Sequence, residues 1–109
     1  MRILFVCSEN RLRSPTAEAV FAGYDGVEAI SAGTNKDAAT PVSGDLIQWA
    51  DVILFMEKTH RKKISKRFGE LLKDKKLGVL DIPDIYGYME PVLVDMLKAK
   101  VPRYVSLQT

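Results

Sequence analysis

Short strand-like runs that alternate with helical segments are the feature that most constrains the fold of this chain. Residues 3–6 and 52–56 are unbroken apolar runs, and residues 27–30 and 77–80 are also strand-like. Such runs are typical of strands that are buried on both faces. Helical signals fall between and after them, at residues 14–22, 43–50, 58–72 and 91–100. We therefore predict an α/β fold with three layers, in which helices cover both faces of a mostly parallel four-stranded sheet.

Composition excludes several classes of protein. The chain has 109 residues, 47% of them hydrophobic and 28% charged, which suits a packed core, and we expect one domain over residues 1–109. A net charge of +2 is too small to indicate a nucleic-acid binder, and no apolar run approaches the roughly 20 residues of a membrane span. The single cysteine excludes an internal disulfide and an all-cysteine zinc site. These features predict a cytoplasmic protein without a signal peptide or a membrane segment.

The loop after the first strand carries the strongest chemical signal. Ligands of parallel α/β sheets bind at the carboxyl ends of the strands, and this loop begins at Cys7 and ends at Arg13. A loop that curls into a helix N-terminus points backbone N–H groups at a common centre and adds the positive end of the helix dipole. That field favours the thiolate form of a cysteine at its base. The loop therefore predicts an anion site with a nucleophile.

Three further roles follow from the chemistry of this loop. The planar guanidinium of Arg13 suits two oxygens of a phosphoryl group. Ser14 can donate a hydrogen bond to the thiolate, and it can also be the N-cap of a helix that starts at Pro15. Asn10 is the residue of this glycine-free loop that best tolerates a left-handed backbone, so we expect it at the turn.

At these residues the chain resembles the low-molecular-weight protein tyrosine phosphatases. Residues 7–19 (CSENRLRSPTAEA) are similar to that family's phosphate-binding loop and first helix. The resemblance continues, in the family's order, in residues 31–34 (SAGT), 51–56 (DVILFM) with His60, and 81–86 (DIPDIY). It implies a cysteine-dependent phosphatase with the fold of that family, and we expect the strand order 2-1-3-4.

The resemblance also implies the roles of the site residues. Cys7 would attack phosphorus to form a phosphocysteine, Arg13 would bind the phosphoryl oxygens, and Ser14 would steady the thiolate. Asp84 would protonate the leaving oxygen, because a phenolate leaves poorly without a proton, and would then activate water. No metal or other cofactor is implied. The phosphate-binding loop would comprise Ser8, Glu9, Asn10, Arg11, Leu12 and Arg13.

Some positions depart from the family's pattern. Glu9 stands where the family usually has glycine, so a negative charge lies on an anion-binding loop and would weaken phosphate affinity or shape specificity. Leu12 stands where the family usually has a second cysteine. The chain is also shorter than members of the family usually are, mainly between Thr34 and Asp51, which predicts a more open wall around the site.

Two assignments on the later loop have alternatives. The family's Asp-Pro pair is replaced here by Asp84 and Ile85, so Asp81 is the rival candidate for the general acid. Tyr86 and Tyr88 would form an aromatic wall beside the ring of the substrate, or would be ordinary core or surface aromatics.

The helical segment of residues 58–72 is strongly basic. Such a segment is most often a solvated face, and the alternative is a docking surface for acidic or nucleic-acid partners. We expect His60, at its start, to cap or pin the helix rather than to take part in catalysis. The basic side chains are Lys58, Arg61, Lys62, Lys63, Lys66 and Arg67.

These observations predict a phosphatase that hydrolyses phosphomonoesters, above all phosphotyrosine, through a phosphocysteine. Its partner would be a phosphotyrosine-containing protein or a small phosphate ester, and nothing in the sequence indicates an oligomeric state. One alternative is a module on the same fold that binds phosphate or phosphopeptides without catalysis. Another, less favoured because further cysteines are absent, is an arsenate reductase that uses an external thiol. A nucleic-acid binder that uses the basic helix is the weakest alternative.

Overall fold

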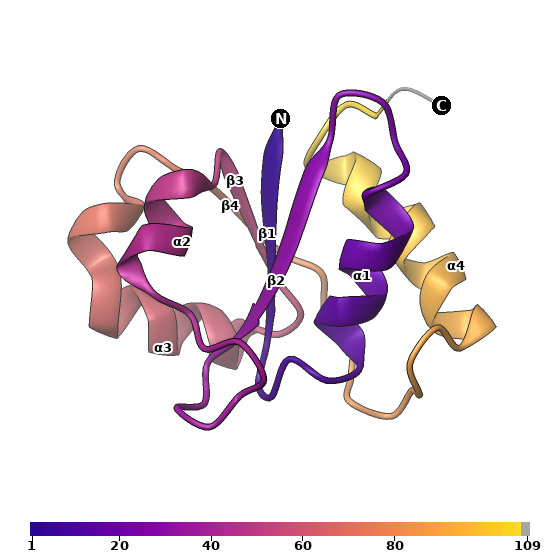
Figure 1. Cartoon of the computed structure of the whole chain (residues 1–109), viewed down its shortest axis with the longest axis horizontal. Coiled ribbons are helices and arrows are strands. Elements are labelled where there is room, and N and C mark those ends of the chain that lie inside the picture. Colours follow the sequence, from indigo (N-terminus) through magenta and orange to yellow (C-terminus); the bar gives the residue numbers. More distant parts are fainter. Residues whose placement is uncertain (108–109) are drawn as a thin grey trace.

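The computed structural model describes residues 1–107 and contains a four-stranded parallel sheet. The strands lie in the order β2-β1-β3-β4 (Figure 1), so the predicted fold class and strand order are confirmed. The carboxyl ends of all four strands lie at the same end of the sheet, at the bottom of the view in Figure 1. The strands are β1 (Arg2–Cys7), β2 (Glu28–Gly33), β3 (Val52–Phe55) and β4 (Lys76–Val79).

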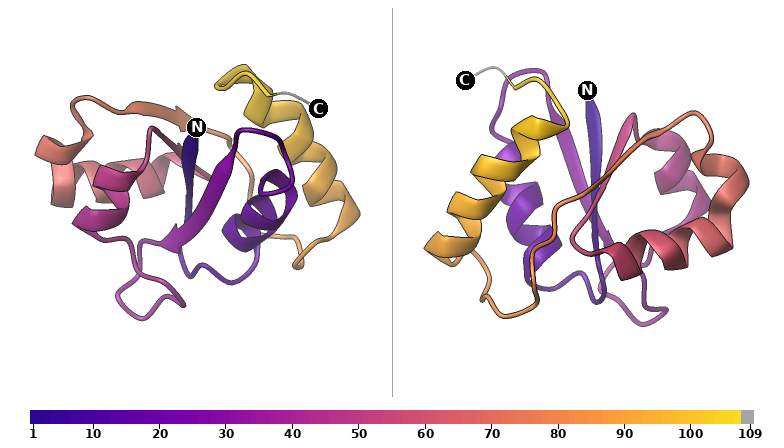
Figure 2. Two further views of the ribbon diagram at one scale, coloured as in Figure 1. Left: turned by 45° about the horizontal axis from the view of Figure 1, so that its top comes forward. Right: turned by 180° about the vertical axis from the view of Figure 1, so that it is seen from behind.

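Helices cover both faces of this sheet, which gives three layers (Figure 1 and Figure 2). On one face lie α1 (Arg13–Phe21) and α4 (Pro91–Lys100), and on the other lie α2 (Gly44–Trp49) and α3 (Lys58–Phe68). Short 3-10 helices follow α3 and α4, namely η1 (Gly69–Leu72) and η2 (Val101–Arg103). Among residues 1–107, no helix combines the length and the apolar character that crossing a membrane requires.

The core consists of two clusters, one under each helical layer. Ile3 and Phe5 of β1 belong to the cluster beneath α1 and α4, and Leu4 and Val6 belong to the cluster beneath α2 and α3. This alternation follows from the two-residue period of a strand. It places the buried Cys7 on the side of α1 and α4.

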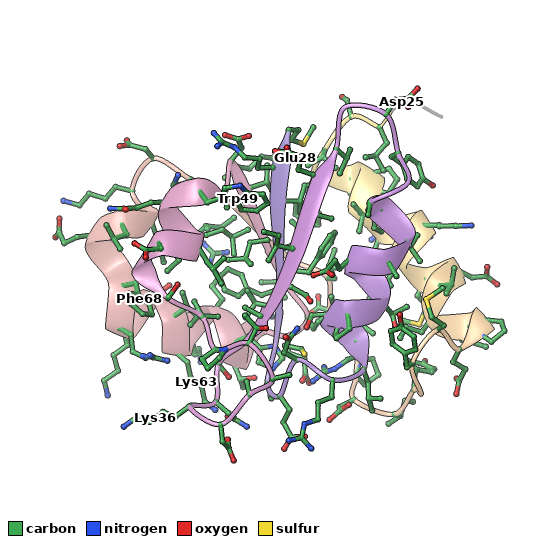
Figure 3. The ribbon with its side chains drawn as sticks, in the orientation of Figure 1. Asp25, Glu28, Lys36, Trp49, Lys63 and Phe68 are labelled. Carbon is green, nitrogen blue, oxygen red and sulfur yellow. The ribbon has the colours of Figure 1, made fainter. Side chains whose placement is uncertain are left out.

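Two aromatic side chains pack at the periphery of the cluster beneath α2 and α3. Trp49 at the end of α2 and Phe68 at the end of α3 are partly buried against it (Figure 3).

Some predicted boundaries are wrong. α1 begins at Arg13 with Leu12 at the N-cap position, so Ser14 is not the N-cap; its hydroxyl group bonds inside the loop instead. β2 does not end at residue 30 but continues to Gly33, because it pairs with β1 as far as Cys7. α3 ends at Phe68, and residues 69–72 form η1 rather than a fourth turn of α-helix.

Candidate active site

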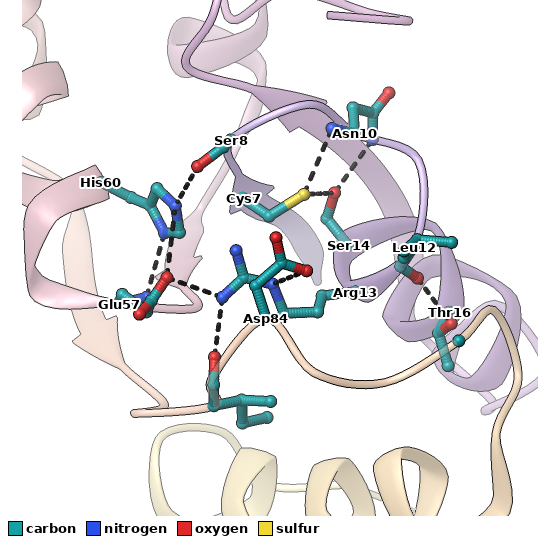
Figure 4. Close-up of polar contacts among 12 residues, drawn as sticks. Cys7, Ser8, Asn10, Leu12, Arg13, Ser14, Thr16, Glu57, His60 and Asp84 are labelled. Atoms are coloured by element: carbon teal, nitrogen blue, oxygen red, sulfur yellow. Dashed lines mark hydrogen bonds and ion pairs between the residues drawn. The ribbon is translucent and has the colours of Figure 1, made fainter.

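The loop after β1 curls around the sulfur of Cys7 and enters α1 (Figure 4). The backbone N–H of Asn10 donates to Cys7 Sγ at 3.2 Å, and Ser14 Oγ lies 2.9 Å from the same sulfur. Asn10 Nδ2 donates to Ser14 Oγ at 3.0 Å. The hydroxyl hydrogen of Ser14 is therefore directed to the sulfur or to the more distant carbonyl of Ala32, at 3.5 Å. These groups form a polar cradle around a buried thiol.

Asn10 makes the turn of this loop with a left-handed φ of 57°. This confirms the expectation for a short polar side chain in a loop without glycine. The loop passes so close to β2 that a Cβ at Gly33 would lie 2.5 Å from the Ser8 carbonyl oxygen and 2.6 Å from Ala38 Cβ. Gly33 thus permits the approach that holds the loop above the end of the sheet.

Arg13 is buried, with only 2% of the residue exposed. Its Nη1 donates to Glu57 Oε2 at 2.8 Å and to the carbonyl oxygen of Ile82 at 2.7 Å. Its Nε lies 3.6 Å from Asp84 Oδ1. A buried guanidinium needs charged or polar partners, and here they come from the segments that follow β3 and β4. Because Nη1 is occupied and Nε faces Asp84, Nη2 is the nitrogen of Arg13 that can meet an anion in the cavity at Cys7.

His60 connects this loop to the start of α3. The Glu57 backbone N–H donates to His60 Nδ1 at 3.0 Å, so Nδ1 carries no proton, and His60 Nε2 lies 2.9 Å from Ser8 Oγ. The Glu57 side chain accepts in return from the His60 backbone, which completes a capping box. Burial, and then the positive charge of Arg13, lower the pKa of His60 from 6.5 to about 4. His60 is therefore neutral near pH 7, and its expected capping role is confirmed.

A small cavity of about 30 Å³ opens at Cys7. By this measure a water molecule needs about 10–15 Å³, so the cavity admits a compact group and leaves the rest of any ligand outside. The residues that line it are Cys7, Ser8, Glu9, Arg11, Leu12, Arg13 and Asp84.

The two candidate acids occupy different places. Asp84 lines the cavity, and its side chain is 62% exposed. Asp81 turns the chain after β4 with a φ of 54° and lines hollows beside α3 instead. Of the two acids, Asp84 is therefore the one that shares the cavity with Cys7.

The predicted aromatic wall lies outside the lining of this cavity, as far as residues 1–107 show. Tyr86 is partly buried against the core beneath α1 and α4, and Tyr88 is 55% exposed. The loop that carries both is tied to α1, because the Met89 backbone N–H donates to Thr16 Oγ1 at 2.9 Å. This bond places Tyr88 and Asp84 on one anchored loop.

Glu57 is the site residue that the sequence analysis does not single out. A signal for it existed, because a buried arginine at the carboxyl edge of the sheet requires a carboxylate there, and Glu57 directly follows the third apolar run. The contact between Ser8 and His60 was also missed. Both contacts join segments that are far apart in the sequence.

The arrangement can bind a compact oxyanion opposite a sulfur nucleophile. The Asn10 N–H, the N-terminus of α1 and the guanidinium of Arg13 supply positive potential at the cavity that Cys7 lines. Among residues 1–107, no three His, Cys, Asp or Glu side chains are grouped so that they could hold a metal ion.

Comparison with known families points in the same direction. The model of the low molecular weight phosphotyrosine protein phosphatase family matches residues 2–44, which contain β1, the Cys7 loop, α1 and β2. A search of curated protein sequences finds no match.

Solved phosphatase structures share the fold. The arginine phosphatase YwlE from Geobacillus stearothermophilus is 27% identical, with 94% of this chain and 88% of that chain covered and a TM-score of 0.73. The tyrosine phosphatase Wzb from Escherichia coli, in complex with phosphate, is 22% identical, with 94% of each chain covered and a TM-score of 0.75. The low molecular weight protein tyrosine phosphatase SP-PTP from Streptococcus pyogenes is 17% identical, with 96% and 93% covered and a TM-score of 0.76. The last two likenesses show the fold alone. The chain thus resembles the low molecular weight phosphotyrosine protein phosphatases in the sequence of residues 2–44 and shares its fold with these solved phosphatases.

Proposed function

We propose that this protein hydrolyses phosphomonoesters, above all phosphotyrosine in a protein or in a small ester, through a phosphocysteine. The observation that carries the proposal is the position of Cys7 Sγ, which contacts the Asn10 N–H and Ser14 Oγ in a cavity shared with Arg13 and Asp84. One cavity thus combines a nucleophile, anion-binding groups and an acid. We place the reaction in the cytoplasm, where a catalytic thiol without a second cysteine stays reduced.

In the first step, the phosphoryl group occupies the cavity, with its oxygens on the loop N–H groups and on Nη2 of Arg13. The thiolate of Cys7 attacks phosphorus, and the P–O bond to the leaving group breaks. Asp84 gives its proton to the leaving oxygen, which a phenolate needs because the pKa of its conjugate acid is about 10. The exposure of the Asp84 side chain, 62%, suits an acid that must reach an ester oxygen outside so small a cavity.

In the second step, water displaces the sulfur. The carboxylate of Asp84 takes a proton from the water molecule, the water oxygen attacks phosphorus, and the S–P bond breaks. Inorganic phosphate leaves, and Asp84 is protonated again for the next cycle. The Asn10 N–H and the Ser14 hydroxyl stabilise the departing thiolate, because both already lie within 3.2 Å of the sulfur.

Tyr86 and Tyr88 are our candidates for contact with the ring of the substrate. Tyr88 is the better placed of the two, because more than half of it is exposed and it shares a loop with Asp84. Tyr86 would act mainly by supporting that loop from the core.

Hydrolysis of para-nitrophenyl phosphate from pH 5 to 8, with a metal chelator present, tests the proposal. The wild-type protein should turn over this ester and be inhibited by vanadate, whereas Cys7→Ser should lose turnover and still bind phosphate. Turnover that survives in Cys7→Ser contradicts the mechanism. Phosphate binding without turnover in the wild-type protein identifies the non-catalytic binding module instead.

Phosphoarginine is a second candidate substrate, and two observations favour it. The arginine phosphatase YwlE is 27% identical to this chain, against 22% and 17% for the two tyrosine phosphatases. The cavity is also lined by the two carboxylates of Glu9 and Asp84, which suit a guanidinium group better than a neutral ring. Rates for phosphotyrosine and phosphoarginine at equal concentration decide between them, and Glu9→Gly should shift the ratio toward phosphotyrosine.

A further inference from the structure

A groove of about 680 Å³ runs along the outer edge of β4. β4 is the last strand of the sheet, and the right panel of Figure 2 shows its edge from behind, between α3 and the segment that follows α4. The volume lies within the range of ligand pockets, about 300–1,000 Å³. One wall consists of basic side chains of α3, the floor is the strand itself, and Tyr104 lies on the other side.

The floor of the groove is an open strand edge. The backbone N–H groups of Lys76 and Leu80 donate to carbonyls on the β3 side of the sheet. Backbone groups of successive strand residues point alternately to the two sides of the strand, so those of Leu77 and Val79 point away from β3 and into the groove. The Val79 carbonyl accepts from Tyr104 Oη at 2.8 Å. The remaining outward groups of Leu77 and Val79 can pair with a further strand.

The charge of the groove selects the kind of strand that fits. Lys58, Arg61 and Lys62 of α3 line it, and among residues 1–107 Asp81 supplies the one carboxylate of the lining. Successive side chains of a strand point to opposite faces. An added strand therefore presents alternate residues to the basic wall and to Tyr104, which favours acidic residues alternating with apolar ones.

The groove leads to the proposed active site. A smaller hollow, of about 350 Å³, shares Lys58 and Asp81 with it and is also lined by Glu57, whose carboxylate accepts from Arg13 Nη1 at 2.8 Å. A chain whose phosphorylated residue lies at Cys7 can thus pass Glu57 and enter the groove at the carboxyl end of β4.

We infer that the β4 groove binds the segment of a phosphoprotein substrate that follows the phosphorylated residue, as an extended acidic strand antiparallel to β4. This inference rests on the proposed phosphatase function. A segment that enters at the carboxyl end of β4 runs antiparallel when it follows the phosphorylated residue, and antiparallel pairs are roughly two- to threefold commoner than parallel ones. The 4 residues of β4 span roughly 13 Å, at about 3.3 Å per residue. Only the nearest few residues of the substrate therefore contribute.

Three synthetic phosphotyrosine peptides of equal length test the inference. In the first, alternating glutamate and valine follow the phosphotyrosine; in the second, glutamine replaces glutamate; in the third, the glutamate-valine run precedes the phosphotyrosine. The first peptide should have a KM about tenfold lower than the other two at low salt. Equal KM values for all three peptides overturn the inference, and a preference for the third overturns its direction.

A charge reversal in the groove provides the matched comparison. The double variant Arg61→Glu/Lys62→Glu should raise the KM of the first peptide about tenfold and leave para-nitrophenyl phosphate hydrolysis unchanged. The control is Lys63→Glu/Lys66→Glu, with the same charge change on the same helix at residues that do not line the groove. If the control raises the KM as much as the groove variant does, the effect comes from the net charge of the protein alone, and the docking site is disproved.

A binding measurement separates failure of this inference from failure of the proposed function. In Cys7→Ser, the first peptide should shift the amide NMR signals of Leu77 and Val79 and slow their hydrogen exchange, whether or not the wild-type protein is active. An absence of these changes overturns the proposed binding of the acidic strand in the β4 groove, even if para-nitrophenyl phosphate is hydrolysed. An absence of hydrolysis with these changes present overturns the phosphatase function alone.

Discussion

Arg13 Nη1 donates to Glu57 Oε2 at 2.8 Å, which joins the first residue of α1 to the N-cap of α3. The same nitrogen donates to the carbonyl oxygen of Ile82 at 2.7 Å, so the guanidinium is held from two sides. Arg13 is buried and Glu57 is 40% exposed. The contact therefore fixes the direction of a buried cation at the candidate site.

Replacing Glu57 should impair catalysis through the position of Arg13. Glu57→Ala removes the carboxylate that orients the guanidinium, and we expect kcat/KM for para-nitrophenyl phosphate to fall about 10–100-fold. It also removes the cap of α3, at a cost of about 1 kcal/mol in the free energy of unfolding. Glu57→Gln keeps an acceptor oxygen and should recover part of both losses. A lower unfolding free energy with unchanged kcat would show that Glu57 has only a structural role.

The guanidinium of Arg13 should be irreplaceable by an amine. A lysine carries the charge but cannot contact Glu57, Ile82 and an oxyanion with one planar group. We expect Arg13→Lys to lower kcat about 10²–10³-fold, as measured by initial rates at saturating substrate. Arg11→Lys, in the same loop, is the comparison because Arg11 is exposed. A larger loss in Arg11→Lys than in Arg13→Lys would reverse the assignment.

The parts of the molecule that were predictable are those that local sequence determines. The apolar run of residues 3–6 specifies a strand buried on both faces, and its two-residue period places Cys7 beneath α1. Asn10 was predictable at the turn because few residues tolerate its φ of 57°. The distance from Cys7 to Arg13 along the chain is short, so their common loop follows directly from the sequence.

The remaining contacts depend on segments that only the tertiary fold brings together. Arg13 donates hydrogen bonds to Glu57 and to the Ile82 carbonyl at the carboxyl end of the sheet, and no local sequence pattern specifies these contacts. Ser14 could be an N-cap or a partner of the sulfur by its chemistry alone, and the tertiary contacts of its hydroxyl with Cys7 and Asn10 decided between them. The continuation of β2 to Gly33 likewise depends on its pairing with β1.

The identity of the acid should appear in the dependence of rate on the leaving group. Asp84 lines the cavity with Cys7, so Asp84→Asn should slow phenyl phosphate, whose leaving group needs a proton, by about 10²–10⁴-fold. An ester with an acidic phenol should be affected much less. The measurement is kcat for a series of aryl phosphates, plotted against the pKa of the phenol.

Asp81→Asn is the control for this series. Asp81 lies just after β4 and outside the lining of the cavity, so its substitution should leave the slope of that plot unchanged. A steep slope in Asp81→Asn, with a flat one in Asp84→Asn, would transfer the acid role to Asp81.

The buried, neutral His60 should make the protein less stable in weak acid. The pKa of His60 is about 4 in the folded state and 6.5 in the unfolded state. Burial lowers the pKa most, Arg13 lowers it next and Lys63 lowers it further, whereas Glu57 and Asp84 raise it. As the pH falls, His60 is therefore protonated in the unfolded chain before it is protonated in the folded one. The free energy of unfolding is highest above pH 6.5 and falls as the pH drops toward 4, by about 2 kcal/mol between pH 6.5 and 5.

Urea unfolding at pH 7, 6 and 5 measures this fall, and His60→Gln identifies its source. Glutamine can still bond to Ser8 and to the Glu57 N–H but takes up no proton, so the variant should lose most of the dependence on pH in this range. Asp51 does not contribute there, because the N–H of Arg2 lowers the pKa of its carboxyl group below 3.8. The same dependence in the wild-type protein and in His60→Gln would show that another group is responsible.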